Sequence, residues 1–528
     1  MIIKIYVFIL LCVGMQSLQA QNYNTIFQQY LATTNGEILT IVNENNIQFD
    51  EQKNMYSLVD KEPIRKSILS KVSNTGNLLW VDTLKVSNYS SSAIAYFQQL
   101  NNKIYSFATY GNNLNSSIAE ACAILVYNAN GTQVNQKIIS NPNTNYFARN
   151  IKVQKNKNLI IQYITNNANQ NWTLHVDCLD SNLNVQWTNS FAWPGYSPTA
   201  IATEVDQFSN TYLSYTTDSM DAGNYYRKAF IHKIDAVGNI QWTTTKWSKR
   251  YLFLRMDFAG NLICSGENIA PLVYVTNNIG DVFVSKINPN SGAVIWDVVY
   301  NNVSNEKELV YSMAIDSLNN ILIGGNENLQ DVTAFHNNGY ARLYSTNGTL
   351  ISSITKPAFE LVYRVGFLNN GNAILRSSTA ANLFLTEYNA TPTLQSSKTI
   401  NFPNGVGWTA MDIAPNNDIA LAVSDVTCAN RGVNILYLSK NPLSTENVSK
   451  EEIIHVYPNP CSTNLTVSTS FSATGKLEIF NSVGQLVIAQ STSNINLQNI
   501  SIANLPNGIY FLKVKTSEGE FIRKFVKE

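Results

Sequence analysis

The feature that most constrains the fold is a hairpin pattern that returns at a nearly constant spacing along most of the chain. Each copy is an alternating apolar and polar stretch, a turn rich in Asn or Gly, and a second such stretch. The interval from Gly76 to Gly131 is nearly equal to the interval from Gly238 to Gly292. Glycine adopts the left-handed conformation of a tight turn without steric cost. Four copies end at a tryptophan: Trp80, Trp187, Trp242 and Trp296.

A second hairpin alternates with the first and carries an aspartate four residues before an asparagine. The aspartates are Asp206, Asp257, Asp316 and Asp412. Aspartate side chains accept backbone N–H groups in turns, so we interpret these residues as turn formers, with a cation-binding ring as the alternative. Residues 30–44 look like a first, looser copy. The two hairpins together give four strands per unit.

Four strands in a period of about 54 residues are typical of a β-propeller blade. One such sheet cannot bury both faces, so the sheets must stack around an axis. Residues 21–443 have room for nearly eight units, and the last one is cut short at residues 433–440. An N-terminal strand would complete that unit and close the ring. We therefore predict an all-β chain with eight blades, and seven as the alternative.

The glycine-to-tryptophan spacing resembles the tryptophan-docking repeat of quinoprotein propellers. Asp235, Gly238 and Trp242 match that repeat closely, whereas the pairs Gly76/Trp80 and Gly292/Trp296 match it in part. In that family each tryptophan packs against the next blade. The resemblance implies a structural role for these residues, and for Trp187 at the same place after a turn. A platform of tryptophans for sugar rings is the alternative.

The C-terminal part of the chain forms a separate module. Residues 444–454 are polar and predict a linker. Short alternating strands with Asn-Ser, Gly and Pro-Asn-Gly turns follow in residues 455–528 and predict a small, immunoglobulin-like β-sandwich. This module resembles the type A C-terminal sorting domain of the type IX secretion system. The positions that carry the resemblance are Tyr457, Pro458, Asn459, Pro460, Gly484, Gly508, Tyr510, Lys513 and Lys524.

The N-terminus predicts export as well. Residues 1–20 hold one lysine, an apolar run and a small residue, Ala20, which is typical of a secretory signal. No later stretch is apolar enough to span a membrane. The sorting resemblance implies passage through the periplasm, contact with the type IX machinery, and a final location at the outer-membrane surface or outside the cell. The net charge of +0 argues against a nucleic-acid partner.

Residues for chemistry are scarce in the sequence. The four histidines are far apart and form no metal-binding or catalytic motif. The five cysteines that follow the signal are scattered, and we expect most to be small buried apolar residues. We therefore predict no catalytic residue, no metal site and no cofactor.

These observations favour a secreted or surface-displayed binding module for a glycan or a protein. The alternative is a propeller enzyme that uses the central funnel, either a quinoprotein-like oxidoreductase or a hydrolase or lyase acting on polysaccharides. Such an enzyme could draw its groups from separate blades.

Overall fold

The computed structural model describes most of the chain after residue 22. The described residues are 23–31, 38–40, 46–63, 65–112, 114, 119–167, 169, 171–194, 197–221, 224–269, 280–300, 307–329, 338–403, 405–407, 409–424, 432–439, 454–469, 475–482, 484–492, 497–516 and 519–528. The predicted signal sequence lies outside these residues. The predicted linker does too, except Ile454, which begins a strand. Two compact units divide the chain, Met1–Pro442 and Leu443–Glu528.

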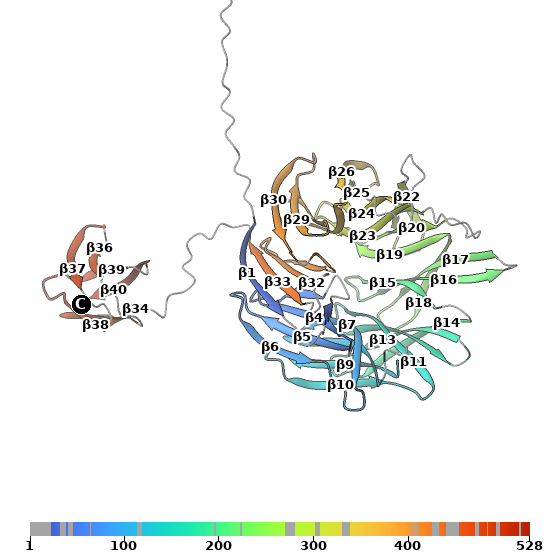
Figure 1. Ribbon diagram of the computed structural model, residues 1–528, viewed down its shortest axis with the longest axis horizontal. Helices are drawn as coiled ribbons and strands as arrows, with labels where there is room; N and C mark the ends of the chain where they lie inside the picture. The colour runs from blue at the N-terminus through green and yellow to red at the C-terminus, as the bar shows by residue number, and fades with distance from the viewer. Residues whose placement is uncertain are drawn as a thin grey trace, which may run out of the picture. The chain divides into compact units, whose positions relative to one another are not determined.

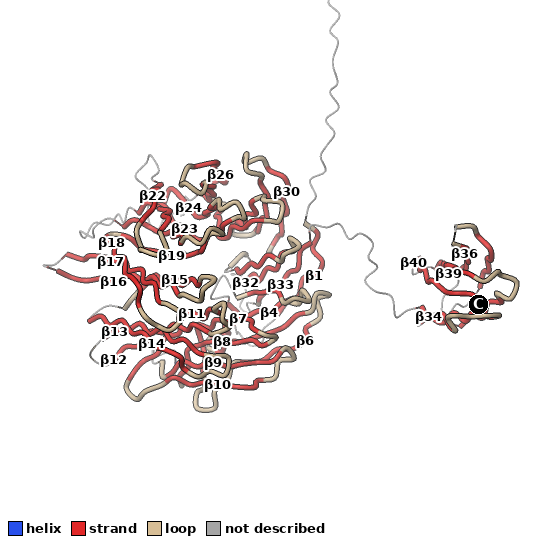
Figure 2. The backbone as a smooth tube through the Cα atoms, turned by 180° about the vertical axis from the view of Figure 1, so that it is seen from behind, coloured by secondary structure: helices blue, strands red, loops and turns tan. Residues whose placement is uncertain are grey.

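Every element in the described part of the chain is a β-strand (Figure 2). The described part of the first unit contains eight sheets, numbered in chain order. It begins with β1 (Asn24–Leu31), which belongs to the last of them. Sheet 1 holds β2 (Ile38–Thr40), β3 (Ile47–Phe49), β4 (Met55–Glu62), β5 (Lys66–Val72) and β6 (Leu78–Thr83). Sheet 2 holds β7 (Ser91–Leu100), β8 (Lys103–Gly111), β9 (Ala121–Asn128) and β10 (Gln133–Ile139). Sheet 3 holds β11 (Thr144–Val153), β12 (Leu159–Asn167), β13 (Asn171–Leu179) and β14 (Val185–Pro194). Sheet 4 holds β15 (Thr199–Val205), β16 (Thr211–Asp221), β17 (Asn224–Ile234) and β18 (Ile240–Trp247).

The remaining strands of this unit follow the same order. Sheet 5 holds β19 (Lys249–Met256), β20 (Leu262–Ile269), β21 (Gly280–Ile287) and β22 (Val294–Tyr300). Sheet 6 holds β23 (Lys307–Ile315), β24 (Ile321–Leu329), β25 (Asn338–Tyr344) and β26 (Leu350–Ala358). Sheet 7 holds β27 (Leu361–Phe367), β28 (Ala373–Ser378), β29 (Asn382–Tyr388) and β30 (Leu394–Asn401). Sheet 8 holds β31 (Thr409–Ile413), β32 (Ile419–Ser424) and β33 (Val433–Ser439), and it is completed by β1.

These sheets follow one another around a ring (Figure 1). The first strands of successive sheets, β7, β11, β15, β19, β23 and β27, contact one another in turn, and β31 contacts β3. Sheet 8 takes its fourth strand from the N-terminus, because β1 pairs antiparallel with β33. The chain is thus all β and folds as a β-propeller, with the N-terminal strand where the sequence predicts it. The count of eight complete blades stays a prediction.

One predicted hairpin is wrong. The described residues of the stretch 30–44 pair elsewhere: Tyr30 and Leu31 of β1 pair with β33, and β2 pairs with β4. The inner hairpin of sheet 1 is formed instead by β3 and β4, around the turn from Asp50 to Asn54. Tyr30 and Leu31 belong to β1, and because β1 completes sheet 8, they are not available to sheet 1.

The four tryptophans of the repeat pack against the turn of the following sheet. The indole N–H of Trp242 in sheet 4 donates to the Pro289 carbonyl in sheet 5 at 2.9 Å, and its ring lies on Gly292. A Cβ added to Gly292 would lie 2.7 Å from that ring. The same N–H contacts join Trp80 to Ala129, Trp187 to Ala236 and Trp296 to Thr346. The rings lie on Gly131, Gly238 and Gly348, while Gly76 receives Phe27 of β1.

The second unit holds two small sheets. One contains β34 (Ile454–Tyr457), β35 (Asn464–Thr469) and β38 (Leu497–Ser501). The other contains β36 (Gly475–Asn481), β37 (Leu486–Thr492), β39 (Gly508–Thr516) and β40 (Gly519–Lys527). Both sheets contribute to one hydrophobic core, with Leu465 from the first and Leu512 and Phe525 from the second. Its classification as an immunoglobulin-like sandwich stays a prediction.

Candidate functional site

The central channel of the propeller holds a cavity of about 900 Å³. Its lining comes mainly from β3 of sheet 1, from the first strands of sheets 2, 3, 4, 5, 7 and 8, and from the turns that follow β3 and β7. Residues of β4, β5, β8 and the turn after β9 complete it: Tyr56, Lys71, Lys103, Ile104 and Ala129. A cavity of this size lies in the range of small-molecule sites. Because many sheets contribute to it, the ring must close before the cavity exists.

Backbone irregularities place several lining side chains. The pairing of β11 with β12 shifts between Ala148 and Asn150, which leaves Arg149 as an extra residue. Equivalent shifts occur in β19 at Leu252 and in β27 just before Arg364. A β-bulge redirects the side chains next to it. The repeated bulges therefore let strands of the propeller core present large side chains to the channel.

Charged side chains of the lining form ion pairs, and these differ in whether the positive and negative charges cancel. Lys71 Nζ lies 3.0 Å from Asp50 Oδ2, so this pair is neutral. The Glu204 carboxylate lies next to the cavity and contacts both Lys152 Nζ at 3.3 Å and Arg255 Nη1 at 3.5 Å. Burial lowers the pKa of Lys152, and Glu204 opposes that effect. Two cations thus share one carboxylate.

Asp412 has a different role from the one that its spacing predicts. It does not form the turn of sheet 8; the turn runs from Ala414 to Asp418 instead. Its carboxylate accepts the backbone N–H of Phe49 in sheet 1 at 2.9 Å and that of Ile413 at 3.0 Å. Burial raises the pKa of this carboxyl, and Arg364 acts in the opposite direction. Asp412 therefore joins sheet 8 to sheet 1 at the cavity wall.

The other repeated aspartates form turns, as predicted. The Asp206 carboxylate accepts the backbone N–H groups of Phe208 and Asn210, both at 2.9 Å. Asp257 and Asp316 accept the N–H of the asparagine four residues later, each at 2.7 Å. Within the described part of the chain, no group of three or more His, Cys, Asp or Glu side chains is arranged to hold a metal ion.

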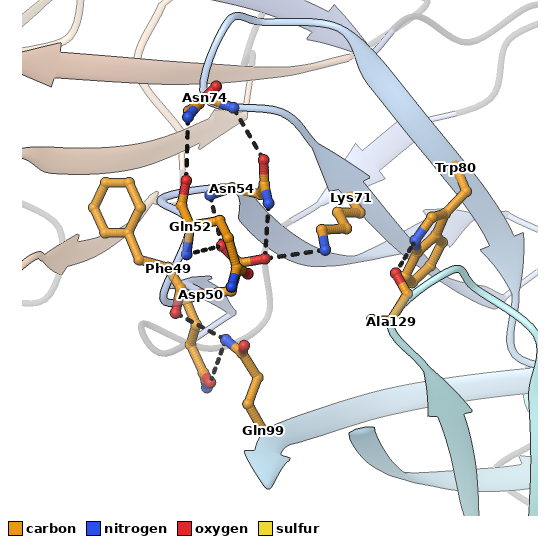
Figure 3. Close-up of polar contacts among 10 residues, drawn as sticks. Phe49, Asp50, Gln52, Asn54, Lys71, Asn74, Trp80, Gln99 and Ala129 are labelled. Atoms are coloured by element: carbon orange, nitrogen blue, oxygen red, sulfur yellow. Dashed lines mark hydrogen bonds and ion pairs between the residues drawn. The ribbon is translucent and has the colours of Figure 1, made fainter. Parts of the chain in front are cut away.

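Asp50 is a site residue that the sequence reading missed. Its carboxylate accepts N–H groups from Gln52 at 3.0 Å and Asn54 at 2.8 Å, and it pairs with Lys71 (Figure 3). The Gln99 amide of sheet 2 donates to the Phe49 carbonyl at 3.1 Å, which links the two sheets beside the cavity (Figure 3). The signal was present, because Asp50 precedes Asn54 by four residues as in the other copies.

Arg149 is a lining cation that lies apart from the ion pairs described above. Its guanidinium lies 5.9 Å from the centre of the Phe147 ring. Burial lowers its pKa, and the groups that oppose this effect are the Tyr96 hydroxyl and the Cys122 thiol. Neither group is a carboxylate. The Arg149 side chain can therefore offer its N–H donors to a ligand in the cavity.

Residues of the predicted sorting signal lie around the last strand of the second unit. The Asn459 carboxamide oxygen accepts the Val526 N–H at 2.9 Å, and Cys461 and Val526 form a backbone hydrogen bond of 2.9 Å. Tyr510 is buried against Phe525 and donates its hydroxyl to the Pro506 carbonyl at 2.8 Å. Gly484 forms the turn between β36 and β37, and Gly508 begins β39. The exposed members are Tyr457, Pro458, Asn459, Pro460, Gly484, Gly508 and Lys524, while Lys513 is half-buried.

Cysteines of the described residues are free and buried: Cys122, Cys178, Cys264 and Cys461. This agrees with their prediction as small core residues, and Cys428 lies outside the described part. Among those same residues no helix is long and apolar enough to cross a membrane.

The fold and the C-terminal unit define an exported propeller protein. Residues 455–528 match the family described as the secretion system C-terminal sorting domain. The second unit is thus a sorting domain of the type IX route, and the protein is directed to the cell surface or the extracellular space. No curated protein matches the chain.

Solved structures similar to the chain include a propeller, a polysaccharide lyase and a protein of unknown function. The Dos1 propeller is 10% identical with a TM-score of 0.48, and the match covers 78% of this chain and 95% of that one. The polysaccharide lyase Uly1 is 9% identical with a TM-score of 0.42, covering 79% of this chain and 99% of that one. A protein of unknown function from Bacteroides caccae is 12% identical with a TM-score of 0.29, covering 62% and 94%.

Proposed function

We propose that this protein is an exported carbohydrate-binding propeller that holds a glycan in its central cavity. The observation that carries the proposal is the cavity of about 900 Å³, lined by polar side chains from many sheets. Its wall presents amide groups at Gln48, Gln98, Gln99 and Asn150. Amides both donate and accept hydrogen bonds, as sugar hydroxyls do.

A glycan fits this site better than a folded protein. A stable protein interface buries about 800 Å² on each partner, whereas this site is a concave space within a ring. Phe49 and Phe253 also line the cavity and offer apolar surface to the faces of sugar rings. The tryptophans of the repeat do not supply this surface, because their rings lie on turns of neighbouring sheets.

Binding can be tested with a glycan array and with calorimetry on the chain that lacks residues 1–20. Gln98 is a suitable residue to replace, because it lies on the cavity wall of sheet 2. If its amide contacts the sugar, Gln98→Ala should weaken binding by about three- to tenfold, the usual range for one hydrogen bond. Gln133→Ala, at an exposed position of the same sheet, is the control and should leave binding unchanged. Equal affinities for both variants would place the glycan elsewhere.

We further propose that the secretion machinery reads exposed residues of the sorting domain such as Tyr457 and Lys524, while Asn459, although exposed, and the buried Tyr510 maintain its fold. Tyr457 and Lys524 are exposed, whereas Tyr510 is buried. Removal of residues 455–528 should leave a folded propeller in the periplasm, because its core is separate. Fractionation of cells and blotting test this. Normal surface levels of the truncated chain would contradict it.

Catalysis in the same cavity is the second candidate, and one observation favours it. The Asp412 carboxyl lies on the wall with a pKa that burial raises, which suits a general acid. Prolonged incubation with the bound glycan, followed by size analysis of the products, separates binding from cleavage. Asp412→Asn should abolish any cleavage that depends on this group. Cleavage that persists in this variant would assign the reaction to other groups.

A further inference from the structure

The charges that line the cavity do not balance. Six lining residues carry a basic side chain: Lys71, Lys103, Arg149, Lys152, Arg255 and Arg364. Three carry an acidic one: Asp50, Glu51 and Asp412. Glu204, which lies beside the wall, raises the acidic number to four, so the excess is two positive charges, six minus four. The chain as a whole has a net charge of +0, so this excess is local.

The ion pairs show where the excess lies. Lys71 is neutralised by Asp50 at 3.0 Å, and Arg364 acts on Asp412. Lys152 and Arg255 share Glu204, so this group of three keeps one positive charge. The side chains of Lys152 and Arg255 are 25% and 32% exposed, which leaves each accessible from the cavity.

Lys103 and Glu51 cancel in this count, and Arg149 supplies the second positive charge. It lies at the bulge of β11 and lines the cavity, beside the Phe147 ring and the Tyr96 hydroxyl. Removing a cation from water has a free-energy cost unless an anion or a set of acceptors replaces the water. Burial is also the main effect on its pKa. An anion that enters the cavity would replace the water that burial removes from the Arg149 guanidinium.

We propose that the glycan held in the cavity is acidic, with carboxylate or sulfate groups that bind Arg149 and the pair Lys152 and Arg255. This inference rests on the proposed function. The cations belong to sheets 3 and 5 and line one cavity of about 900 Å³. That volume admits several sugar units, so one chain can present successive charges to both groups. Arginine binds carboxylates and sulfates through paired N–H donors, which favours these groups over neutral hydroxyls.

The first test compares matched probes by calorimetry on the chain that lacks residues 1–20. Hexagalacturonate and its fully methyl-esterified form have the same sugar chain and differ in charge, and a heparin-derived hexasaccharide supplies sulfate. We expect at least one acidic probe to bind about tenfold or more tightly than the ester, and its affinity to fall as NaCl is raised. Monomeric galacturonate, as the free anion, should bind more weakly than the hexamer.

The second test uses one variant that should weaken binding of the acidic probe and one that should strengthen it. Arg149→Gln should weaken the acidic probe by about tenfold and leave binding of the ester nearly unchanged, since one charge-assisted hydrogen bond contributes that much. Lys155→Gln removes an exposed cation from the turn after the same strand and should change neither. Glu204→Gln removes the carboxylate that competes for Lys152 and Arg255, and it should strengthen binding of the acidic probe. A structural role alone would not raise affinity.

The outcomes separate this inference from the proposed function. Equal binding of the acidic hexamer and its ester would overturn the inference while glycan binding stands. Tighter acidic binding that Arg149→Gln and Glu204→Gln leave unchanged would also overturn it, because the charges would act elsewhere. Tight binding of monomeric galacturonate at the hexamer's affinity would point to a free acid as the ligand. Failure of these probes and of every glycan on the array would overturn both proposals.

Discussion

The two junctions on either side of sheet 3 fill the same gap in different ways. Between sheets 3 and 4, Trp187 of the outer strand lies on Gly238 in the next turn. Between sheets 2 and 3, the turn itself supplies a side chain: Leu183 is buried at 4% exposure against residues of sheet 2 such as Tyr105. Leu183 has a φ of 71°, where glycine occurs at the equivalent turns of sheets 1, 2, 4, 5 and 6. A gap between blades can thus be filled from either side.

The comparison shows that what the junctions share is a filled gap between neighbouring sheets, whereas the residue that fills the gap differs. A tryptophan requires a glycine opposite, because a Cβ at position 238 would lie 2.7 Å from the indole. A leucine in the turn requires a small partner and tolerates backbone strain. Left-handed conformations of residues other than glycine cost about 1–2 kcal/mol, and burial of a leucine side chain returns about 1.5–3 kcal/mol. Both solutions therefore stabilise the junction.

The largest effect is expected from the tryptophan junction. Trp187→Ala should lower the free energy of unfolding by about 3–5 kcal/mol, because it removes a large aromatic ring that is only 9% exposed. Asn135→Ala is the control at the other junction, where the amide makes one long hydrogen bond of 3.4 Å to Asn182; we expect a loss below about 1 kcal/mol. Denaturant unfolding of both variants measures the difference. Equal losses would remove the distinction between the junctions.

Leu183 gives the next largest effect. Leu183→Ala should cost about 2–3 kcal/mol, since it deletes buried methyl groups while the backbone strain remains. Leu183→Gly should cost about 1 kcal/mol less, because glycine relieves that strain. This order is the reverse of the usual one in regular structure. Thermal and denaturant unfolding check it, and a glycine variant less stable than the alanine variant would show that strain does not matter here.

The turn glycines sharpen the comparison with a smaller change. Gly238→Ala should cost about 2 kcal/mol, because the new Cβ is strained at a φ of +97° and also meets the Trp187 ring. Gly371→Ala has a similar φ of +80° but no atom within 4 Å, so strain alone should cost about 1 kcal/mol. In the double variant with Trp187→Ala, the extra cost at Gly238 should disappear. A cost unchanged in that double variant would exclude the contact as its cause.

Acid should weaken the junction between sheets 3 and 4 more than the junction between sheets 2 and 3. His232 of sheet 4 stacks on Phe191 of sheet 3 at 4.5 Å and hydrogen-bonds to the Tyr215 and Thr243 hydroxyls. Burial lowers the pKa of His232 to about 4. The unfolded chain, with an ordinary histidine pKa of about 6.5, takes up its proton first, so stability is complete above pH 6.5 and falls as the pH drops towards 4.

The size of this pH effect is modest. At pH 5.5, His232 should have reduced the free energy of unfolding by about 1–2 kcal/mol relative to pH 8. His232→Phe should remove this part of the pH dependence, whereas His175, whose pKa burial also lowers, would still contribute in that variant. Denaturant midpoints across pH 5 to 8 test this. Identical pH profiles for the variant and the natural chain would contradict a titrating His232.

The sequence by itself determined the repeating unit, because turn chemistry and strand alternation are local. It predicted that an N-terminal strand completes the last sheet beside β33, since the repeat is cut short at residues 433–440 and no fourth strand of that unit follows. It also determined the sorting domain, whose motifs lie together within positions 455–528. Asp206, Asp257 and Asp316 form the turns that their spacing indicates.

Only the tertiary structure decided what depends on closure of the ring. Asp412 has the same spacing as the turn aspartates, yet its carboxylate binds Phe49, which is 363 residues away in sequence. Leu183 stands where other turns have glycine, and its side chain is buried against residues of sheet 2 such as Tyr105. Arg149, Lys152 and Arg255 look like ordinary strand residues until the bulges and the ring bring them to one cavity. Local patterns carry no signal for such contacts, since their free energy arises only when distant strands pack together.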